Sequence, residues 1–152
     1  MSESWRGRPV AERELLGEGG SLHPGGLALT ERTLQLCSLS PGARVIDLGC
    51  GTGATVAFLD SSCPFSVVGL EPCPQNIARA RRLHPESHFE DGGGEAIPRD
   101  DACLDCVLCE CVLSVTEDPS RTVREVHRVL RPGGWLAVSD LYLRSGDRPA
   151  SR

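Results

Sequence analysis

The residues with the clearest chemical potential lie in one short stretch, residues 47–53, in which glycines alternate with other residues. The acidic Asp47 comes first, and Gly49, Gly51 and Gly53 follow it. Glycines in a turn allow left-handed backbone and let a ligand approach the main chain closely. When a helix follows such a turn, its first N–H groups face the ligand and attract polar or anionic groups. This stretch therefore predicts a binding site for a nucleotide-like ligand.

Two ligand classes fit the turn. Gly49, Gly51 and Ala54 satisfy the dinucleotide pattern G-x-G-x-x-G/A, and Glu71 stands where an acidic residue would bind ribose hydroxyls. Asp47 favours another ligand, because its carboxylate would lie at the mouth of the turn, close to a pyrophosphate. Like charges about 4 Å apart repel by about 4 kcal/mol at an effective dielectric constant of about 20. A ligand with an ammonium and a sulfonium group, such as S-adenosylmethionine, would instead be attracted. A dinucleotide remains the alternative.

Strands and helices alternate along the chain and must bring these residues together. The apolar run 43–48 predicts a strand buried on both faces, and a second strand over 65–70 ends at Glu71. A helix that begins at Ala54 connects them, and this spacing forms a right-handed parallel unit. Further strands are expected near 87–90, 104–113 and 135–139, and further helices at 27–38, at 75–83 and between 119 and 131. The fold class is therefore α/β, a Rossmann-like doubly wound sheet of about five mainly parallel strands with flanking helices.

Length, composition and charge restrict the function. The 152 residues suffice for one domain with a sizeable core, and the net charge of −5 argues against general affinity for the phosphate backbone of nucleic acids. No apolar run reaches membrane-spanning length, and residues 1–20 hold no apolar signal segment. We therefore expect a cytoplasmic protein that binds neither nucleic acid nor membrane and that acts on a small molecule.

Four motifs in the expected order resemble the class I S-adenosylmethionine-dependent methyltransferase family. They are residues 47–53, 69–72, 94–98 and 128–135, the last being similar to the family's approach to its fifth strand. The resemblance implies S-adenosyl-L-methionine as the cofactor and methyl transfer to an unidentified, small-molecule acceptor. It implies that the cofactor is held by Asp47, Gly49, Cys50, Gly51, Gly53, Glu71, Pro72, Gly94, Glu95 and Cys109. No catalytic residue is assigned, because the sulfonium carries the reactivity and the protein has to position the two reactants.

The chain departs from the family where adenine would bind. Gly93 and Gly94 occupy the position of the family's Asp-Ala pair, whose carboxylate accepts the adenine amino group. Asp91 comes two residues early, and Glu95 comes one residue late. We therefore expect adenine to be bound through the backbone N–H of Gly94.

The second departure concerns the end of the chain. The family fold continues with two more strands after residue 142, where only a polar segment remains here. We expect a flexible arm at residues 1–24, a cofactor-binding domain at 25–142 and a polar tail at 143–152, with the C-terminal strands of the usual fold missing. A cofactor-binding fragment without catalysis is therefore an alternative function. The strand at 135–139 would be an uncovered edge, and such edges pair with other chains, so self-association is expected.

Eight cysteines offer another kind of site. Cys103, Cys106, Cys109 and Cys111 have a spacing that resembles iron–sulfur or zinc ligands. Side chains alternate between the faces of a strand, however, so Cys106 should point away from Cys103 and Cys109, and one metal ion could not bind all four. Reduced thiols in the core are favoured. A cysteine-rich metal or redox protein remains an alternative.

Two further residues are of types that often serve in catalysis. Glu110 falls at the carboxyl end of the predicted sheet and could act as a general base, although a hydrogen-bonded or solvent-facing carboxylate is favoured. His127 shares a helical face with Val123 and Val126. It is therefore expected to be a packed or half-exposed residue of that helix and not a ligand.

Overall fold

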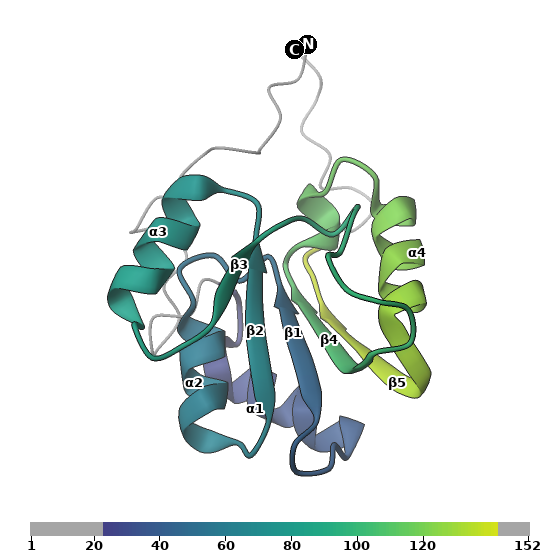
Figure 1. Ribbon diagram of the computed structural model, residues 1–152, viewed down its shortest axis with the longest axis horizontal. Coiled ribbons are helices and arrows are strands. Elements are labelled where there is room, and N and C mark those ends of the chain that lie inside the picture. Colours follow the sequence, from purple (N-terminus) through teal and green to yellow (C-terminus); the bar gives the residue numbers. More distant parts are fainter. Residues whose placement is uncertain (1–22, 143–152) are drawn as a thin grey trace.

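A computed structural model describes residues 23–142 (Figure 1). Most of the expected arm, residues 1–22, and the expected tail, residues 143–152, lie outside the described residues. Among the helices of the described region, none has the length and apolar character needed to cross a membrane. In chain order the elements are α1 (Gly26–Cys37), β1 (Arg44–Leu48), α2 (Ala54–Ser62), β2 (Ser66–Glu71), α3 (Pro74–Leu83), β3 (Phe89–Asp91), β4 (Leu104–Glu110), the 3-10 turn η1 (Leu113–Val115), α4 (Pro119–Val129) and β5 (Leu130–Ser139).

The five strands form one parallel sheet in the order β3-β2-β1-β4-β5 (Figure 1). β1 lies at the centre, with Asp47 beside Gly69 of β2 on one side and beside Leu108 of β4 on the other. The expected α/β class and the five parallel strands are confirmed. The carboxyl ends of parallel strands meet at one end of the sheet, which is where ligands bind in folds of this class.

Apolar side chains fill both faces of the sheet. On the face that we call the α1 face, residues of α1, α2 and α3 pack against Val45, Val67 and Leu108 of the strands. On the opposite α4 face, Val126 and Val129 of α4 belong to the core. Figure 1 shows α4 at the right beside β4 and β5, and α1 behind the sheet. Strands covered on both faces have nearly continuous apolar sequences, which is why β1 and β4 give such clear signals.

The helices begin where the sequence has start signals. The side chain of Asp118 accepts the N–H of Arg121 at 2.8 Å and so caps α4, and Pro119 follows in the first turn, where no N–H partner is needed. Pro74 has the same place in α3. These local signals explain why both helices begin where the sequence predicts.

A loop, and not a helix, connects β3 to β4. Arg128 of α4 fastens this loop, because its guanidinium donates to the carbonyl oxygens of Arg99 at 2.7 Å and Ile97 at 2.9 Å. Glu125 completes the link by accepting the N–H of Ile97 at 3.0 Å. The loop that carries the expected adenine-binding residues is therefore held against α4.

The predicted residue bounds of two strands were wrong. β4 ends at Glu110 and does not continue to residue 113, because Cys111 takes a left-handed backbone with φ of 58° and η1 follows. β5 begins at Leu130, earlier than expected, and its pairing with β4 is irregular before Trp135 pairs with Cys106. The turn at Cys111 directs the chain away from the sheet immediately after Glu110.

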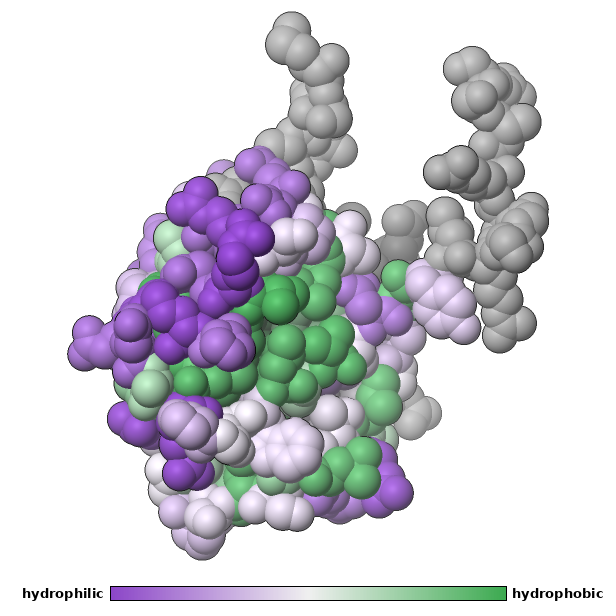
Figure 2. All heavy atoms as spheres, turned by 90° about the vertical axis from the view of Figure 1, so that its right-hand side faces the viewer, coloured by the Kyte–Doolittle hydropathy of each residue, from purple (hydrophilic) through white to green (hydrophobic). Residues whose placement is uncertain are grey.

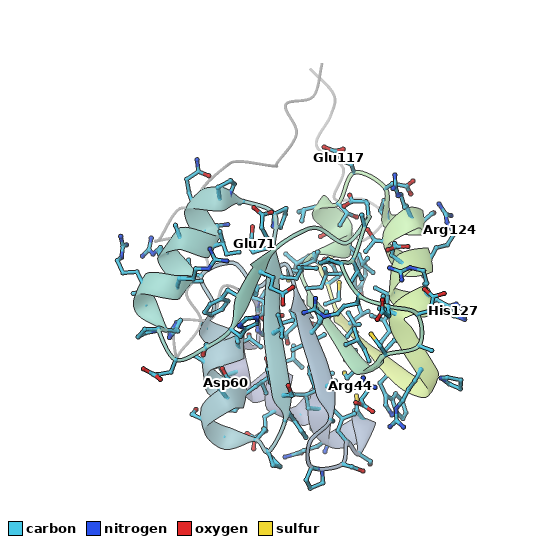
Figure 3. The ribbon with its side chains drawn as sticks, in the orientation of Figure 1. Arg44, Asp60, Glu71, Glu117, Arg124 and His127 are labelled. Carbon is cyan, nitrogen blue, oxygen red and sulfur yellow. The ribbon has the colours of Figure 1, made fainter. Side chains whose placement is uncertain are left out.

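The buried face of α4 also differs from the expected one. Thr122, Val126 and Val129 are buried, whereas Val123 is 43% exposed and His127 is exposed. Figure 3 shows His127 on the outer side of α4. The sequence pattern predicted burial of Val123 and not of the neighbouring Thr122, because Thr122 is polar and gave no signal for burial.

The outer side of β5 is open. Within the described residues, β5 pairs only with β4, and Trp135 and Val138 remain 47% and 42% exposed. Figure 2, which looks onto the side of α4 and β5, shows apolar side chains gathered in a broad patch. The expected uncovered edge is therefore present in this structure.

Candidate functional site

Three acidic side chains lie on the α1 face at the carboxyl end of the sheet. Glu71 ends β2, Glu110 ends β4, and Asp47 is the second-last residue of β1. Each is an even number of residues from a strand residue in the core of the α1 face, so all three point to that face. Figure 3 shows Glu71 at the upper end of the sheet and Arg44 at the lower end. The sheet therefore places three carboxyl groups together where a ligand would bind.

The turn after β1 has the left-handed backbone that its glycines permit. φ is 70° at Gly49 and 85° at Gly53. A Cβ atom on Gly49 would lie 2.5 Å from Val112 Cγ2, and one on Gly53 would lie 2.6 Å from Phe89 Cζ. Both positions therefore require glycine for conformation and for space. As a result the main chain of this turn, residues 49–53, which we call the cradle, packs closely against its neighbours.

Glu71 is joined to this turn. Its Oε2 accepts the N–H of Gly51 at 2.9 Å, and its Oε1 accepts the N–H of Cys73 at 2.9 Å. The side-chain amide of Asn76 lies 3.4 Å from Oε1. The residue is 3% exposed, so these donors replace water around the carboxylate. A carboxylate offers about four acceptor positions, and one on Oε2 is left for a further donor such as a ribose hydroxyl.

Asp47 is buried beneath the turn. The residue is 3% exposed, so its carboxyl group lies deeper than the mouth of the turn, where the sequence pattern placed it. Within the described part of the chain, no hydrogen bond reaches its carboxyl group. Burial raises the pKa of Asp47 well above its ordinary value, and the nearby carboxylates of Glu110 and Glu71 raise it further. A cation placed beside Asp47 would reverse this shift.

Cys50 and Pro72 border the same unit. Cys50 lies in the glycine turn, and its Sγ is 2.7 Å from the place where a Cβ on Gly69 would be. Gly69 is therefore needed for the turn to approach β2. Pro72 follows Glu71 directly and is half-buried. These residues, the turn 47–53 and Glu71 therefore lie together at the ends of β1 and β2.

The remaining predicted residues lie toward α4. A Cβ on Gly94 would lie 2.6 Å from Thr122 Cγ2, and Glu95 Oε1 accepts the N–H of Glu117 at 3.3 Å. Cys109 is fully buried in the apolar core of the α4 face. In this structure Gly94, Glu95 and Cys109 support the carboxyl end of the sheet from the α4 side.

The cysteine cluster is divided between the two faces. Cys106 belongs to the core of the α1 face, whereas Cys109 and Cys103 lie on the α4 face, which confirms the expected alternation. Burial raises the pKa of Cys106 and of Cys109 to about 12, so both thiols stay protonated at neutral pH. All eight cysteines are free thiols. Within residues 23–142, no three His, Cys, Asp or Glu side chains form a group that could hold a metal ion.

One residue at this end was not predicted. His23, assigned to the flexible arm by the sequence, is 6% exposed, and its Nε2 lies 3.0 Å from Glu110 Oε2. Glu110 also accepts from the hydroxyls of Thr30 at 2.8 Å and Thr55 at 3.3 Å, so it is hydrogen-bonded, as favoured. A single histidine after a glycine-rich polar segment carries no local signal. Only its place directly before a helix expected to cover the sheet could have pointed to it.

Comparison with known proteins agrees with this geometry. The family profile of a methyltransferase domain matches residues 46–138, which include the glycine turn, Glu71 and Glu110. The chain belongs to the class I S-adenosylmethionine-dependent methyltransferase family. The resemblance drawn from the four motifs is confirmed.

Two curated members of the methyltransferase family show how far the likeness extends. The uncharacterized methyltransferase YodH of Bacillus subtilis is 34% identical over 141 residues, which are 91% of this chain and 60% of that protein. The thiol S-methyltransferase TMT1B of Homo sapiens is 33% identical over 118 residues, which are 70% of this chain and 48% of that protein. The chain thus spans about half of the length of the relatives that it matches.

A solved structure of the same methyltransferase-like fold gives a further comparison. The crystal structure of the [4+2]-cyclase SpnF superposes with a TM-score of 0.69 at 28% identity, over 80% of this chain and 49% of the cyclase. Because this neighbour is a cyclase, the fold by itself does not decide the reaction, which has to be argued from the site.

Proposed function

We propose that this chain binds S-adenosyl-L-methionine at the carboxyl end of its sheet and transfers the methyl group to a small-molecule acceptor. The observation that carries the proposal is the buried Asp47, which lies near Glu71 and Glu110 and which no hydrogen bond from residues 23–142 reaches. A group that brings positive charge to this place relieves the repulsion among the three carboxyl groups. The ammonium and the sulfonium of S-adenosylmethionine supply such charge.

Other features of the site support the same ligand. The glycines hold the turn at 49–53 against Val112 and Phe89, where a Cβ at Gly49 or Gly53 would clash, and so fix the main chain that would face the ligand. Glu71 is held in place by the turn itself and keeps an acceptor position for a ribose hydroxyl. We assign the methionine part of the cofactor to Asp47, Gly49, Cys50, Gly51 and Gly53, the ribose to Glu71 and Pro72, and the adenine to the side formed by Gly94, Glu95 and the backbone of Cys109.

The bound cofactor supplies an activated methyl group, so the protein needs no strong base for a nucleophilic acceptor. The residues at the ends of β4 and β5 have to orient the acceptor and exclude water. Asp140 is one such residue, because it holds η1 by accepting the backbone N–H of Ser114 at 2.9 Å and its hydroxyl at 2.6 Å. Small thiols are the first acceptor class to test, since a thiol S-methyltransferase is among the relatives.

The dinucleotide alternative makes a different demand on the site. A pyrophosphate next to Asp47 would bring negative charge to a place that already holds three acidic groups. Burial raises the pKa of Asp47, which weakens the repulsion expected from the sequence, but Glu71 and Glu110 still disfavour an anion. The glycine turn alone would accept either ligand, so the carboxyl groups have to distinguish them.

One calorimetric experiment tests the proposal. The full chain is titrated with S-adenosylhomocysteine, the demethylated cofactor, and separately with NAD. We expect binding of the first and none of the second. Micromolar binding of NAD without binding of S-adenosylhomocysteine would overturn the assignment. A mass-spectrometric assay with S-adenosylmethionine and small thiols then separates a methyltransferase from a cofactor-binding fragment without catalysis, because the fragment would bind and leave every acceptor unmethylated.

A further inference from the structure

One buried polar cluster joins three segments at the candidate cofactor site. Its centre is the carboxylate of Glu110 at the end of β4. Oε2 lies 3.0 Å from Nε2 of His23 and accepts the hydroxyl of Thr55 at 3.3 Å, and Oε1 accepts the hydroxyl of Thr30 at 2.8 Å. His23 directly precedes α1, Thr30 belongs to α1, and Thr55 lies in the first turn of α2. One carboxylate therefore holds the starts of two helices.

The geometry around His23 favours a protonated imidazole opposite Glu110. Nδ1 of His23 lies 3.3 Å from the carbonyl oxygen of Pro24, and Nε2 faces Glu110, so each ring nitrogen has an acceptor. Both nitrogens can donate only when the imidazole is protonated. The hydrogen bond that His23 donates to Glu110 raises the pKa of His23, although burial opposes the shift. The side chains are 7% and 5% exposed, so solvent screens the pair little.

This cation lies where the site has an excess of negative charge. Glu110 and Glu71 both raise the pKa of the buried Asp47. His23 offsets the charge of Glu110, the first of these two neighbours. Thr55 follows Gly53 by two residues, so its bond to Glu110 also fixes the junction between the glycine turn and α2. The cluster therefore acts on both the charge and the shape of the cradle.

We propose that His23 is a positioning residue of the cofactor site, whose ion pair with Glu110 holds the start of α1 and the start of α2 against the carboxyl ends of β1 and β4. The proposal rests on the proposed function, since it assumes that this end of the sheet binds S-adenosylmethionine. It goes beyond that function because His23 lies outside the residues 46–138 that match the methyltransferase family profile. The role of the pair is to keep the cradle formed and not to contact the reacting atoms.

The pair makes cofactor affinity depend on pH. Among the described residues, Glu110 on β4 and the hydroxyl of Thr30 on α1 face His23. Glu110 in turn accepts the hydroxyl of Thr55 on α2 and raises the pKa of Asp47 on β1. The thiols of Cys109 and Cys111 next to Glu110 have raised pKa values and stay neutral. Because the pKa of His23 is raised in the folded protein, the pair is complete below the ordinary histidine value of 6.5 and is lost as the pH rises through the raised value. Asp47 acts in the opposite direction, since its ionisation at higher pH favours a cationic ligand.

A pair of variants separates these effects. In His23→Gln, a neutral donor replaces the cation, and in the control His88→Gln the same change is made in the exposed pair of His88 and Glu90, whose charged atoms lie 3.1 Å apart. The full chain is titrated with S-adenosylhomocysteine at about pH 6 and about pH 9, below and above the titration range of histidine. The titration of the ligand is common to both proteins and cancels in the ratio of affinities, whereas a change at Asp47 that follows the loss of His23 acts through Glu110 and is part of the effect of the pair.

We expect His23→Gln to bind about tenfold more weakly than wild type at the lower pH, which corresponds to one pKa unit of coupling. At the higher pH the ratio should approach one, and His88→Gln should match wild type at both values. A ratio that is the same at both pH values, whether large or equal to one, would overturn the proposal. Absence of binding by wild type would instead overturn the proposed function, and the role of His23 with it.

A second variant guards against a failure to fold. The double variant His23→Gln/Glu110→Gln removes both charges and keeps a donor facing an acceptor. Its thermal unfolding midpoint, measured without ligand, should lose the part of the pH dependence that wild type shows above pH 6.5. If wild type and the double variant have parallel midpoints across this range, the pair carries no charge-dependent stabilisation and the proposal is wrong.

Discussion

The two halves of the sheet differ in how completely their polar and apolar groups are paired. Around β1 and β2, Glu71 accepts the N–H groups of Gly51 and Cys73, and the glycine turn packs so closely that a Cβ atom at Gly49 or Gly53 would clash with a neighbouring side chain. Around β5, Trp135 and Val138 are exposed and, in the described residues, one side of the strand has no partner (Figure 2). The first half is thus shaped for a small ligand, whereas the second half has a surface on which another segment or chain could pair.

This difference teaches where substitutions should matter. A tightly paired region is sensitive because any lost acceptor or added atom leaves a defect that cannot relax. An open edge is insensitive in stability but decides association. Four predictions test this contrast, beginning with the largest effect.

Replacement of Glu71 by alanine should destabilise the half of the sheet around β1 and β2. The N–H groups of Gly51 and Cys73 would lose their buried acceptor, at a cost of about 1–3 kcal/mol for each unsatisfied group. We expect a loss of about 2–5 kcal/mol in the free energy of unfolding and no detectable binding of S-adenosylhomocysteine. Denaturant unfolding and calorimetry measure both. The exposed Glu86→Ala is the control and should behave as wild type; an equally mild effect of Glu71→Ala would show that the turn does not depend on this carboxylate.

Replacement of Gly94 by alanine should cause strain that a second substitution relieves. The new Cβ would lie 2.6 Å from Thr122 Cγ2, and overpacking of this kind costs about 1–3 kcal/mol. Thr122 Oγ1 is buried without a hydrogen-bond partner, so Thr122→Ala removes the obstacle without breaking a bond. The double variant should recover at least half of the lost stability in a thermal melt. If Thr122→Ala gives no recovery, Gly94 is required for a reason other than this contact.

Asp47→Asn should separate stability from binding. An acid whose pKa is raised by folding binds its proton more tightly in the folded state, so its contribution to stability falls as the pH rises above the ordinary value of 3.8. The asparagine variant should therefore melt at a higher temperature than wild type at neutral pH. It should also bind S-adenosylhomocysteine more than tenfold more weakly, which is about 1.4 kcal/mol per factor of ten. An unchanged affinity would remove Asp47 from the site.

A charge on the β5 edge should change association with little effect on stability. Val138 is 42% exposed, so Val138→Lys should alter the free energy of unfolding by less than about 0.5 kcal/mol. If the edge pairs with a second copy of the chain, wild type should form dimers or larger species in sedimentation experiments and the lysine variant should form fewer. Monomeric wild type at high concentration would show that the edge does not self-associate.

The sequence predicts most where a feature is local. The turn at 47–53 with the strand before it and the helix after it was predicted correctly because glycine spacing and apolar runs lie within a few residues of one another. The predicted end of β4 was wrong because Cys111, a residue without special backbone preference, takes the left-handed conformation. No propensity could indicate that turn.

The candidate site was predictable in composition but less so in geometry. Asp47 and Glu71 were found from their spacing, yet the depth of Asp47 follows from the packing of α1 and α2 over the sheet. The pair of His23 and Glu110 depends on a contact between residues far apart in the chain. Such contacts follow from the completed fold, so a single sequence does not reveal them.

The central position of β1 has a consequence for how the chain folds. β1 pairs with β2, which follows it closely, but also with β4, which follows only after two helices, two strands and a loop. Pairing between distant segments requires a long loop to close first, which slows folding. We expect the half formed by β1, β2 and β3 to assemble early, which leaves the other edge of β1 unpaired until β4 has formed. Unfolded or partly folded chains can aggregate through this unpaired edge. The yield of folded protein should therefore fall as the protein concentration during refolding rises.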